Sequence, residues 1–157
     1  MGTYAARTGV SVEKSKGEIE RVLSRYGADE FAYVVRQDCA KVAFVLEGRR
    51  IQFTLPLPSQ NDPKFCKTPT GRFRAPGEKT RAAALEAWEQ ACRQSWRALA
   101  LAIKAKLEVV ESGIATLEDE FLGYMVLPNG QTLSEWAVPQ LDHFKIEMPR
   151  LVAKQAG

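Results

Sequence analysis

Apolar residues near the start of the chain follow a helical spacing and predict a short first helix. They recur three or four residues apart between residues 19 and 26. Ser15 followed by Glu18 matches a capping box, a pairing that satisfies free amide groups at a helix start. Gly27 is typical of the residue just beyond a helix end, because glycine readily adopts a left-handed backbone. The pattern predicts a helix from Ser15 to about Gly27.

Three short runs of β-branched and aromatic residues come next and predict strands. They span residues 31–35, 42–46 and 50–55, and turn-forming residues separate them. In the third run apolar residues alternate with polar ones, so the apolar side chains share one face. Pro56 ends this run because proline donates no hydrogen bond to a sheet. We therefore expect a three-stranded antiparallel meander.

The longest predicted element is a helix from Glu78 to Ser112, a stretch without proline or glycine. Its apolar residues form one stripe: Leu85, Trp88, Cys92, Trp96, Leu99, Ile103 and Val110. Such a helix would be roughly 50 Å long, whereas a compact chain of this size is about 40 Å across. Apolar surface that projects into water is costly. We therefore expect a homo-oligomer formed through this helix, or a partner helix.

The remaining pattern predicts a small helix–strand–helix section at the C-terminal end. A capping box at Thr116 opens a short helix to Leu122, residues 124–127 predict a strand, and a second capping box at Thr132 opens a helix to about Phe144. The complete order is a short helix, a three-stranded meander, one long helix and this section. The predicted fold class is therefore α+β.

The length of 157 residues fits one domain. We expect residues 1–14 to form a loose leader, residues 15–148 a single α+β domain, and residues 149–157 a tail. Residues 59–77 show no periodicity and are expected to form a long loop within the domain. Loops of this length are uncommon in compact domains and are often functional or disordered.

The net charge of +3 is the sum of three unequal segments. Residues 1–48 hold seven Lys and Arg and seven Asp and Glu, residues 49–106 hold twelve against four, and residues 107–157 hold three against eight. A basic segment that also carries Phe and Trp residues is typical of a nucleic-acid groove. The alternative is a solvated surface whose charges pair with the acidic final third.

The loop 59–77 carries most of the candidate binding residues, since its four cations face a single acid, Asp62. If nucleic acid binds, we expect phosphate contacts from Arg49, Arg50, Lys64, Lys67, Arg72 and Arg74, with Phe65 or Phe73 stacking on bases. The alternative interpretation of the loop is a mobile surface excursion without a ligand.

Motifs of common catalytic and metal sites are missing from the sequence. There is one histidine, His143, and the three cysteines (Cys39, Cys66 and Cys92) form no C-x-x-C pair. The acidic run Glu118–Glu120 is a poor metal site, because adjacent helical positions point in different directions. We therefore expect no enzyme, no metal ion and no cofactor.

Hydropathy and cysteine usage indicate the compartment. No apolar run approaches the roughly 20 residues of a membrane helix, and the first residues contain no apolar segment typical of a secretory signal. Scattered cysteines of odd number are typical of a reducing environment. We expect a cytoplasmic protein that makes no membrane contact.

Four blocks of the sequence resemble small proteins carried by bacteriophages and prophages. They are RYGA (25–28), GRRIQF (48–53), WRALALAIKAKLE (96–108) and VLPNG (126–130). The similarity runs from about Val12 to about Pro149. It implies a phage or mobile-element protein in a bacterial host cell, and it implies no catalytic activity.

The order of elements resembles two nucleic-acid-binding folds. In the Rad52-like single-strand annealing core, a β-meander leads to a long helix in a ring-forming protomer, which fits the long helix and the expected self-association. The double-stranded-RNA-binding domain has a similar order, and residues 77–82 resemble the basic opening of its second helix. Here, however, the paired lysines of that domain are missing and the preceding loop is longer.

Two functions are compatible with these observations. The first is a non-catalytic phage or mobile-element protein that binds nucleic acid, with single-stranded DNA favoured, as an annealing or recombination accessory. The second is a phage-encoded inhibitor or adaptor that binds a host protein, such as a defence or nuclease component. Its opposed basic and acidic segments would then provide electrostatic complementarity.

Overall fold

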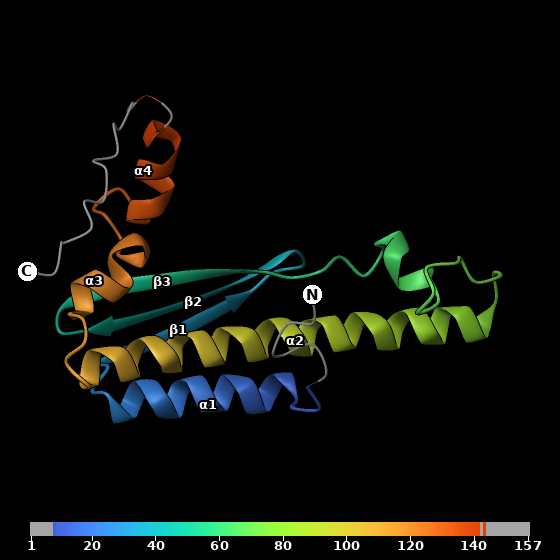
Figure 1. The fold of residues 1–157 in the computed structure, drawn as a ribbon, viewed down its shortest axis with the longest axis horizontal. Helices are drawn as coiled ribbons and strands as arrows, with labels where there is room; N and C mark the ends of the chain where they lie inside the picture. Colours follow the sequence, from blue (N-terminus) through green and yellow to red (C-terminus); the bar gives the residue numbers. More distant parts are fainter. Residues whose placement is uncertain (1–7, 142, 144–157) are drawn as a thin grey trace, which may run out of the picture.

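The computed structural model describes residues 8–141 and 143 and has the predicted α+β fold. In chain order the elements are α1 (Val12–Arg25), β1 (Glu30–Val35), β2 (Cys39–Leu46), β3 (Arg49–Pro56), the 3-10 helix η1 (Pro63–Cys66), α2 (Glu78–Glu111), α3 (Leu117–Phe121), the 3-10 helix η2 (Leu122–Tyr124) and α4 (Leu133–Leu141). α1 and α2 run side by side along the sheet (Figure 1). The predicted helix, meander and long helix are thus confirmed.

The sheet is an antiparallel meander with strand order β1-β2-β3. Phe44 in the middle strand lies opposite Phe31 on one side and Ile51 on the other, so these side chains share one face. That face is buried along the whole of β2, whereas Val34 and Lys41 on the other face are exposed. One face of the sheet therefore belongs to the core and the other faces solvent.

The core forms where α1 and α2 cover the buried face of the sheet. Ile19 from α1 and Ile103 from α2 are buried in the same cluster as Phe44. α3 closes one end with Phe121, whose ring lies edge-on to Phe44 and Phe53 at centroid distances of 6.1 and 6.2 Å. Edge-to-face packing of this kind is a preferred arrangement of aromatic rings.

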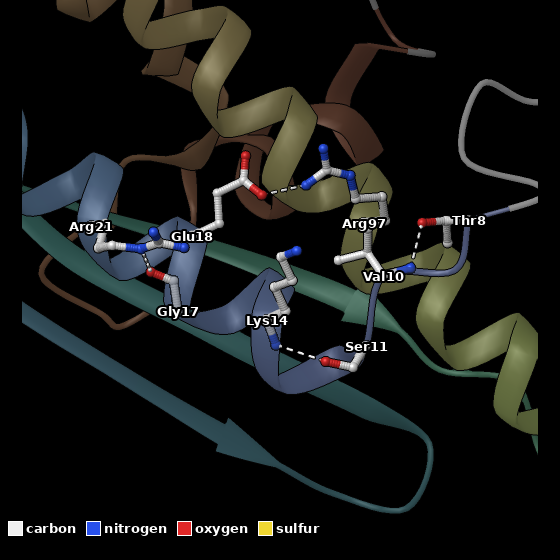
Figure 2. A network of polar contacts seen from close by, with 8 residues as sticks. All are labelled: Thr8, Val10, Ser11, Lys14, Gly17, Glu18, Arg21 and Arg97. Atoms are coloured by element: carbon white, nitrogen blue, oxygen red, sulfur yellow. Dashed lines mark hydrogen bonds and ion pairs between the residues drawn. The ribbon is translucent and has the colours of Figure 1, made fainter.

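Polar contacts fix α1 against α2 at the margin of this core. Glu18 reaches from α1 to Arg97 of α2 and forms an ion pair with it (Figure 2). Further along, the Tyr26 hydroxyl donates a hydrogen bond to a Glu108 carboxylate oxygen at 3.1 Å. The two helices are therefore aligned by contacts at two separate points.

The first helix begins earlier than the capping box predicts. Ser11 is the N-cap, and its hydroxyl accepts a hydrogen bond from the Lys14 amide at 3.1 Å (Figure 2). Ser15 instead lies within α1, where it is buried and its hydroxyl has no partner among the described residues. Residues 12–14, expected in the leader, belong to the helix. Gly27, at φ +83°, follows the helix end as predicted.

The C-terminal section contains no regular strand among the described residues. The predicted strand at 124–127 is reduced to isolated bridges, which join Met125 to Ile51 and Val126 to Thr132. Tyr124 ends η2, and its ring stacks on Phe53 at a centroid distance of 4.1 Å. The segment therefore crosses the edge of β3 at one point instead of pairing along it. Phe144 and the tail 149–157 lie outside the described residues.

The long helix matches its prediction closely, since α2 ends at Glu111 and Ser112 is its C-cap. One face of its C-terminal half is buried in the core, while its N-terminal half extends beyond the sheet (Figure 1). Leu85 in that half is 41% exposed. No helix in the described part of the chain is long and apolar enough to cross a membrane.

The position of the first N-cap gives a direct test of the fold. We expect Ser11→Ala to lower the free energy of unfolding by about 1 kcal/mol, because the Lys14 amide loses its acceptor. Ser15→Ala is expected to be neutral or stabilising, because it removes a buried hydroxyl that lacks a partner. Urea unfolding of both variants measures the difference. A larger loss for Ser15→Ala than for Ser11→Ala would contradict this assignment.

Candidate nucleic-acid interface

The projecting half of α2 and the loop before it form an arm, which we define as residues 57–90. The Trp88 indole N–H donates a hydrogen bond to the Pro58 carbonyl at 2.8 Å, which ties the start of the loop to the helix. Phe65 in η1 is 7% exposed, and η1 packs against α2. The loop thus lies along the helix instead of extending freely into solvent (Figure 1).

Local hydrogen bonds give the loop a defined shape. Asp62 caps η1 by accepting a hydrogen bond from the Lys64 amide at 3.0 Å. Beyond η1 the chain turns back on itself, and the Arg74 amide donates to the Cys66 carbonyl at 2.9 Å. Gly71 lies in the turn at φ +83°, a conformation that favours glycine. The stretch predicted to be irregular therefore contains a capped 3-10 turn and a tight hairpin.

The hairpin and η1 present the predicted cations of the loop to solvent. Lys64, Lys67, Arg72 and Arg74 are all exposed. Lys64 forms an ion pair with Asp62 at 3.1 Å, whereas Arg72 and Arg74 have no ion pair with any described residue. Hydrogen bonds from the Lys64 amide and ammonium hold the pKa of Asp62 below its usual value. This carboxylate therefore stays charged at neutral pH and offsets only one cation.

The two predicted stacking residues have different environments. Phe73 is 66% exposed, and the Lys67 ammonium nitrogen lies 4.9 Å from its ring centroid. Phe65 is buried and anchors η1 to α2. Only Phe73 of this pair presents a ring on which a base could stack.

Arg49 and Arg50 lie at the opposite end of β3 from the loop. The strand runs from Arg49 to Pro56, so Arg50 is about 20 Å from the point at which the loop begins. The Arg49 guanidinium also forms an ion pair with Glu118 of α3 at 3.4 Å. The structure therefore groups the four loop cations and leaves these two arginines apart.

Two further cations extend the basic surface of the arm. Lys79 and Arg81 lie in the first turns of α2, directly after the loop, and both are exposed. Sequence analysis assigned them to the long helix and did not include them in the candidate site. Their position next to the loop in the sequence was the available signal.

A pocket of about 600 Å³ lies at the base of the arm and is lined in part by arm residues, and we call it the tryptophan pocket. Its walls come from the first turns of α1, the β1–β2 turn, the loop after β3 and the middle of α2. Trp88, Cys92 and Trp96 line its α2 side, because residues four apart share one face of a helix. Sequence analysis treated these three residues as part of an apolar stripe. Their four-residue spacing was visible in the sequence. The sequence did not predict which other segments would pack opposite them and form the remaining walls.

One cation of the tryptophan pocket, Lys16, lies over the ring of Trp96 in the pocket wall and over that of Tyr33 in β1. The Lys16 ammonium nitrogen lies 4.9 Å from the Tyr33 ring centroid and 4.8 Å from that of Trp96. Burial raises the pKa of the Cys92 thiol, and the Glu89 carboxylate adds to this effect. The thiol therefore stays protonated at neutral pH, so it suits a wall of the pocket better than a nucleophile.

Each acidic residue of the run in α3 has a partner within the fold. Glu118 pairs with Arg49, and Glu120 pairs with Lys106 at 3.3 Å. Asp119 forms the capping box with Thr116, whose hydroxyl and amide hydrogen bonds lower the pKa of the carboxyl. No three potential metal ligands come together in the described part of the chain.

The chain was compared with known proteins, and no family model, no curated protein and no solved structure matches it. The resemblances to phage proteins and to an annealing core therefore stay predictions.

The environment of Cys92 predicts how its reactivity depends on pH. We expect its rate of alkylation to keep rising above about pH 8.5, the usual pKa of a thiol, because burial disfavours the thiolate. The raised pKa also means that the contribution of Cys92 to stability is present below the unfolded pKa and is lost as pH rises through the folded pKa. Alkylation with iodoacetamide at several pH values, read for each cysteine by mass spectrometry, measures the midpoint.

The same peptide in the denatured protein serves as the control, and its midpoint should return to the usual value. A midpoint for folded Cys92 at or below that value would contradict the assigned burial.

Proposed function

We propose that this chain is a non-catalytic nucleic-acid-binding protein of a phage or mobile element, which acts on single-stranded DNA in the bacterial cytoplasm as an annealing or recombination accessory. The observation that carries the proposal is the charge of residues 63–81 within the arm. This segment holds six cations and one acid, Glu78, and the other three acids of the arm (Asp62, Glu86 and Glu89) lie on either side of it. All six cations are exposed: Lys64, Lys67, Arg72, Arg74, Lys79 and Arg81.

A surface of this kind suits a phosphate backbone. Each phosphate that a Lys or Arg neutralises releases condensed counterions, which drives binding and makes it sensitive to salt. Arg72 and Arg74 suit this role best, because no described carboxylate pairs with them. Their place on a hairpin at the end of the arm leaves them accessible to a long polymer.

The exposed ring of Phe73 favours a single strand over a duplex. Unpaired bases can stack on an aromatic side chain, whereas the bases of a duplex are already stacked on each other. Lys67 lies next to this ring at 4.9 Å, so a base on the ring would bring a phosphate close to a cation. The arm therefore combines the two contacts that single-strand binders use.

The titratable groups with shifted pKa values support a non-catalytic role. Tyr26 lies at the end of α1, Asp62 in the arm, Asp119 in α3 and Cys92 in the pocket, and each pKa shift has a local cause in hydrogen bonding or burial. Acid–base chemistry needs such groups to converge on one reacting position. Among the described residues these groups belong to separate parts of the fold.

We also propose that the chain forms a homo-oligomer through α2. Leu85 is exposed on the projecting half, and Ala98 and Ala102 leave part of the other half accessible. Small side chains allow helices to approach closely. An assembly would present several arms to one strand, which multiplies weak contacts.

Removing the two unpaired arginines tests the proposal. We expect Arg72→Ala/Arg74→Ala to bind a labelled single-stranded oligonucleotide about tenfold or more weakly at low salt. The slope of log K against log salt is expected to fall by about 1.4, because two phosphate contacts are lost and each contributes about 0.7 on a single strand. Fluorescence anisotropy over a salt series measures both quantities.

Arg21→Ala/Arg25→Ala is the matched control, because it removes the same charge from the exposed surface of α1. It should bind nearly as the wild type does. Phe73→Ala should weaken single-strand binding by about 1–3 kcal/mol and leave duplex binding little changed. No binding at low salt, or equal losses for the two arginine pairs, would overturn the proposal.

The second candidate function, an inhibitor or adaptor that binds a host protein, is favoured by α4. Trp136, Val138 and Leu141 on this helix are 50%, 57% and 53% exposed. Exposed aromatic and aliphatic residues are typical of protein interfaces, and Val138 and Leu141, three residues apart, share one side of the helix. α4 also lies away from the arm (Figure 1), so the two surfaces can be tested separately.

For this second function, we expect immobilised wild-type protein to retain one stoichiometric partner from bacterial lysate. Trp136→Ser/Leu141→Ser should lose the partner because it removes the exposed apolar area, whereas Arg72→Ala/Arg74→Ala should keep it. Quantitative mass spectrometry of the bound fraction measures the difference. A bound fraction that is the same for all three proteins, or that contains no stoichiometric partner, speaks against this function.

A further inference from the structure

We propose that the tryptophan pocket binds one nucleotide, with the base against the α2 wall and the phosphate at the basic rim. The proposal rests on the proposed function, because this nucleotide belongs to the strand that follows the arm. A volume of about 600 Å³ falls within the range of small-molecule pockets.

Hydrogen bonds within the chain hold the walls in place without a ligand. The Leu57 amide donates to the Asp38 carbonyl at 2.9 Å, which joins the loop after β3 to the β1–β2 turn. The bond from the Trp88 indole to the Pro58 carbonyl joins the same loop to α2. The pocket is therefore preformed, which lowers the entropy cost of binding.

The α2 wall suits a planar aromatic group. Trp88 and Trp96 lie two helical turns apart, with the small side chain of Cys92 between them. Trp96 is buried and the Lys16 ammonium lies over its ring, so Trp88 provides the stacking surface. The protonated thiol of Cys92 adds an apolar surface at this point. Because the Trp88 N–H is already bonded, the indole offers its ring surface to a ligand, and every nucleobase has a ring face that can stack there.

The rim of the pocket suits a phosphate. Lys16 and Arg36 contribute positive charge, and neither forms an ion pair with a described residue. Arg93 also lines the pocket, and its guanidinium is held by the Gln90 side-chain oxygen at 3.0 and 2.7 Å. These three cations outnumber the two acids of the lining, Glu13 and Glu89.

Polar side chains of the lining match the edge of a base. Gln37, Gln60 and Asn61 can donate and accept hydrogen bonds, as amides do when they pair with adenine. Carboxylates such as Glu89 accept hydrogen bonds from amino groups of bases. An inorganic anion would use only the rim, so the full lining fits a nucleotide better than a phosphate ion.

The pocket is continuous with the arm along the chain. Gln60 and Asn61 line the pocket, and the next residue, Asp62, caps η1. Lys64, the first cation of the arm, follows within the same turn. A strand held by the arm can therefore place one of its nucleotides in the pocket.

Fluorine NMR of protein labelled with 5-fluorotryptophan tests the proposal directly. The chain has three tryptophans, so three signals are expected, and single Trp→Phe variants assign them. Adding deoxyadenosine monophosphate should shift the Trp88 and Trp96 signals in a saturable way. The Trp136 signal, from α4 outside the pocket lining, should stay unchanged.

Two further probes and one pair of variants separate the contribution of the phosphate from that of the base. Inorganic phosphate alone and deoxyadenosine alone should each bind at least about tenfold more weakly than the nucleotide, because each uses half of the pocket. Arg36→Ala should weaken nucleotide binding about tenfold. Arg36 lies on an exposed turn, so this variant is expected to fold, and circular dichroism checks it. Arg25→Ala, outside the pocket, should have no effect.

Oligonucleotide binding by the same samples keeps the two proposals distinguishable. Oligonucleotide binding without nucleotide-induced shifts overturns the pocket proposal and leaves the arm proposal standing. Shifts without oligonucleotide binding support a site for a free nucleotide, and they overturn both the arm proposal and the assignment of this nucleotide to a bound strand. Equal shifts with inorganic phosphate, or equal shifts of all three tryptophan signals, overturn the pocket as a nucleotide site.

Discussion

An eight-residue strand of the sheet spans about 26 Å and the 34-residue α2 spans about 51 Å, so the sheet can cover only about half of the helix. The covered half contributes Trp96 and Ile103 to the core around Phe44. The uncovered half is left for the loop after β3, whose Phe65 is buried as η1 packs on it. The arm therefore arises from a difference in length between two packed elements. The tryptophan pocket lies where the covered and uncovered halves meet.

The charged residues of the basic segment also differ between the core end of the molecule and the arm. Arg49 and Lys106 belong to the basic segment of the sequence, and both form ion pairs with the acidic residues of α3. Arg72 and Arg74 belong to the same segment but lie on the arm, out of reach of those acids. Pairing with the acidic third therefore accounts for part of the basic segment. On the arm, Arg72 and Arg74 have no ion pair with any described residue.

Elements with strong local signals could be predicted from the sequence. The capping box at Thr116 and the position of Gly27 agree with the structure, because each acts within a few residues of the chain. The prediction that Ser15 caps the first helix was wrong. Ser15 matches a capping box, but it also lies four residues before Ile19, on the buried side of α1. Extending the helix by one turn buries part of Val12, and Ser11 then supplies the cap. Tertiary burial outweighed a local pattern here.

The sequence alone was sufficient for the α+β class, the meander, the long helix and the gathering of cations in one loop, because periodicity, turns and composition are local properties. It was not sufficient to place Arg50 about 20 Å from that loop, to bury Phe65, or to close a pocket from four segments. These features depend on which segments pack together. Packing is governed by the burial of apolar surface between residues far apart in the chain, and no local pattern carries that information.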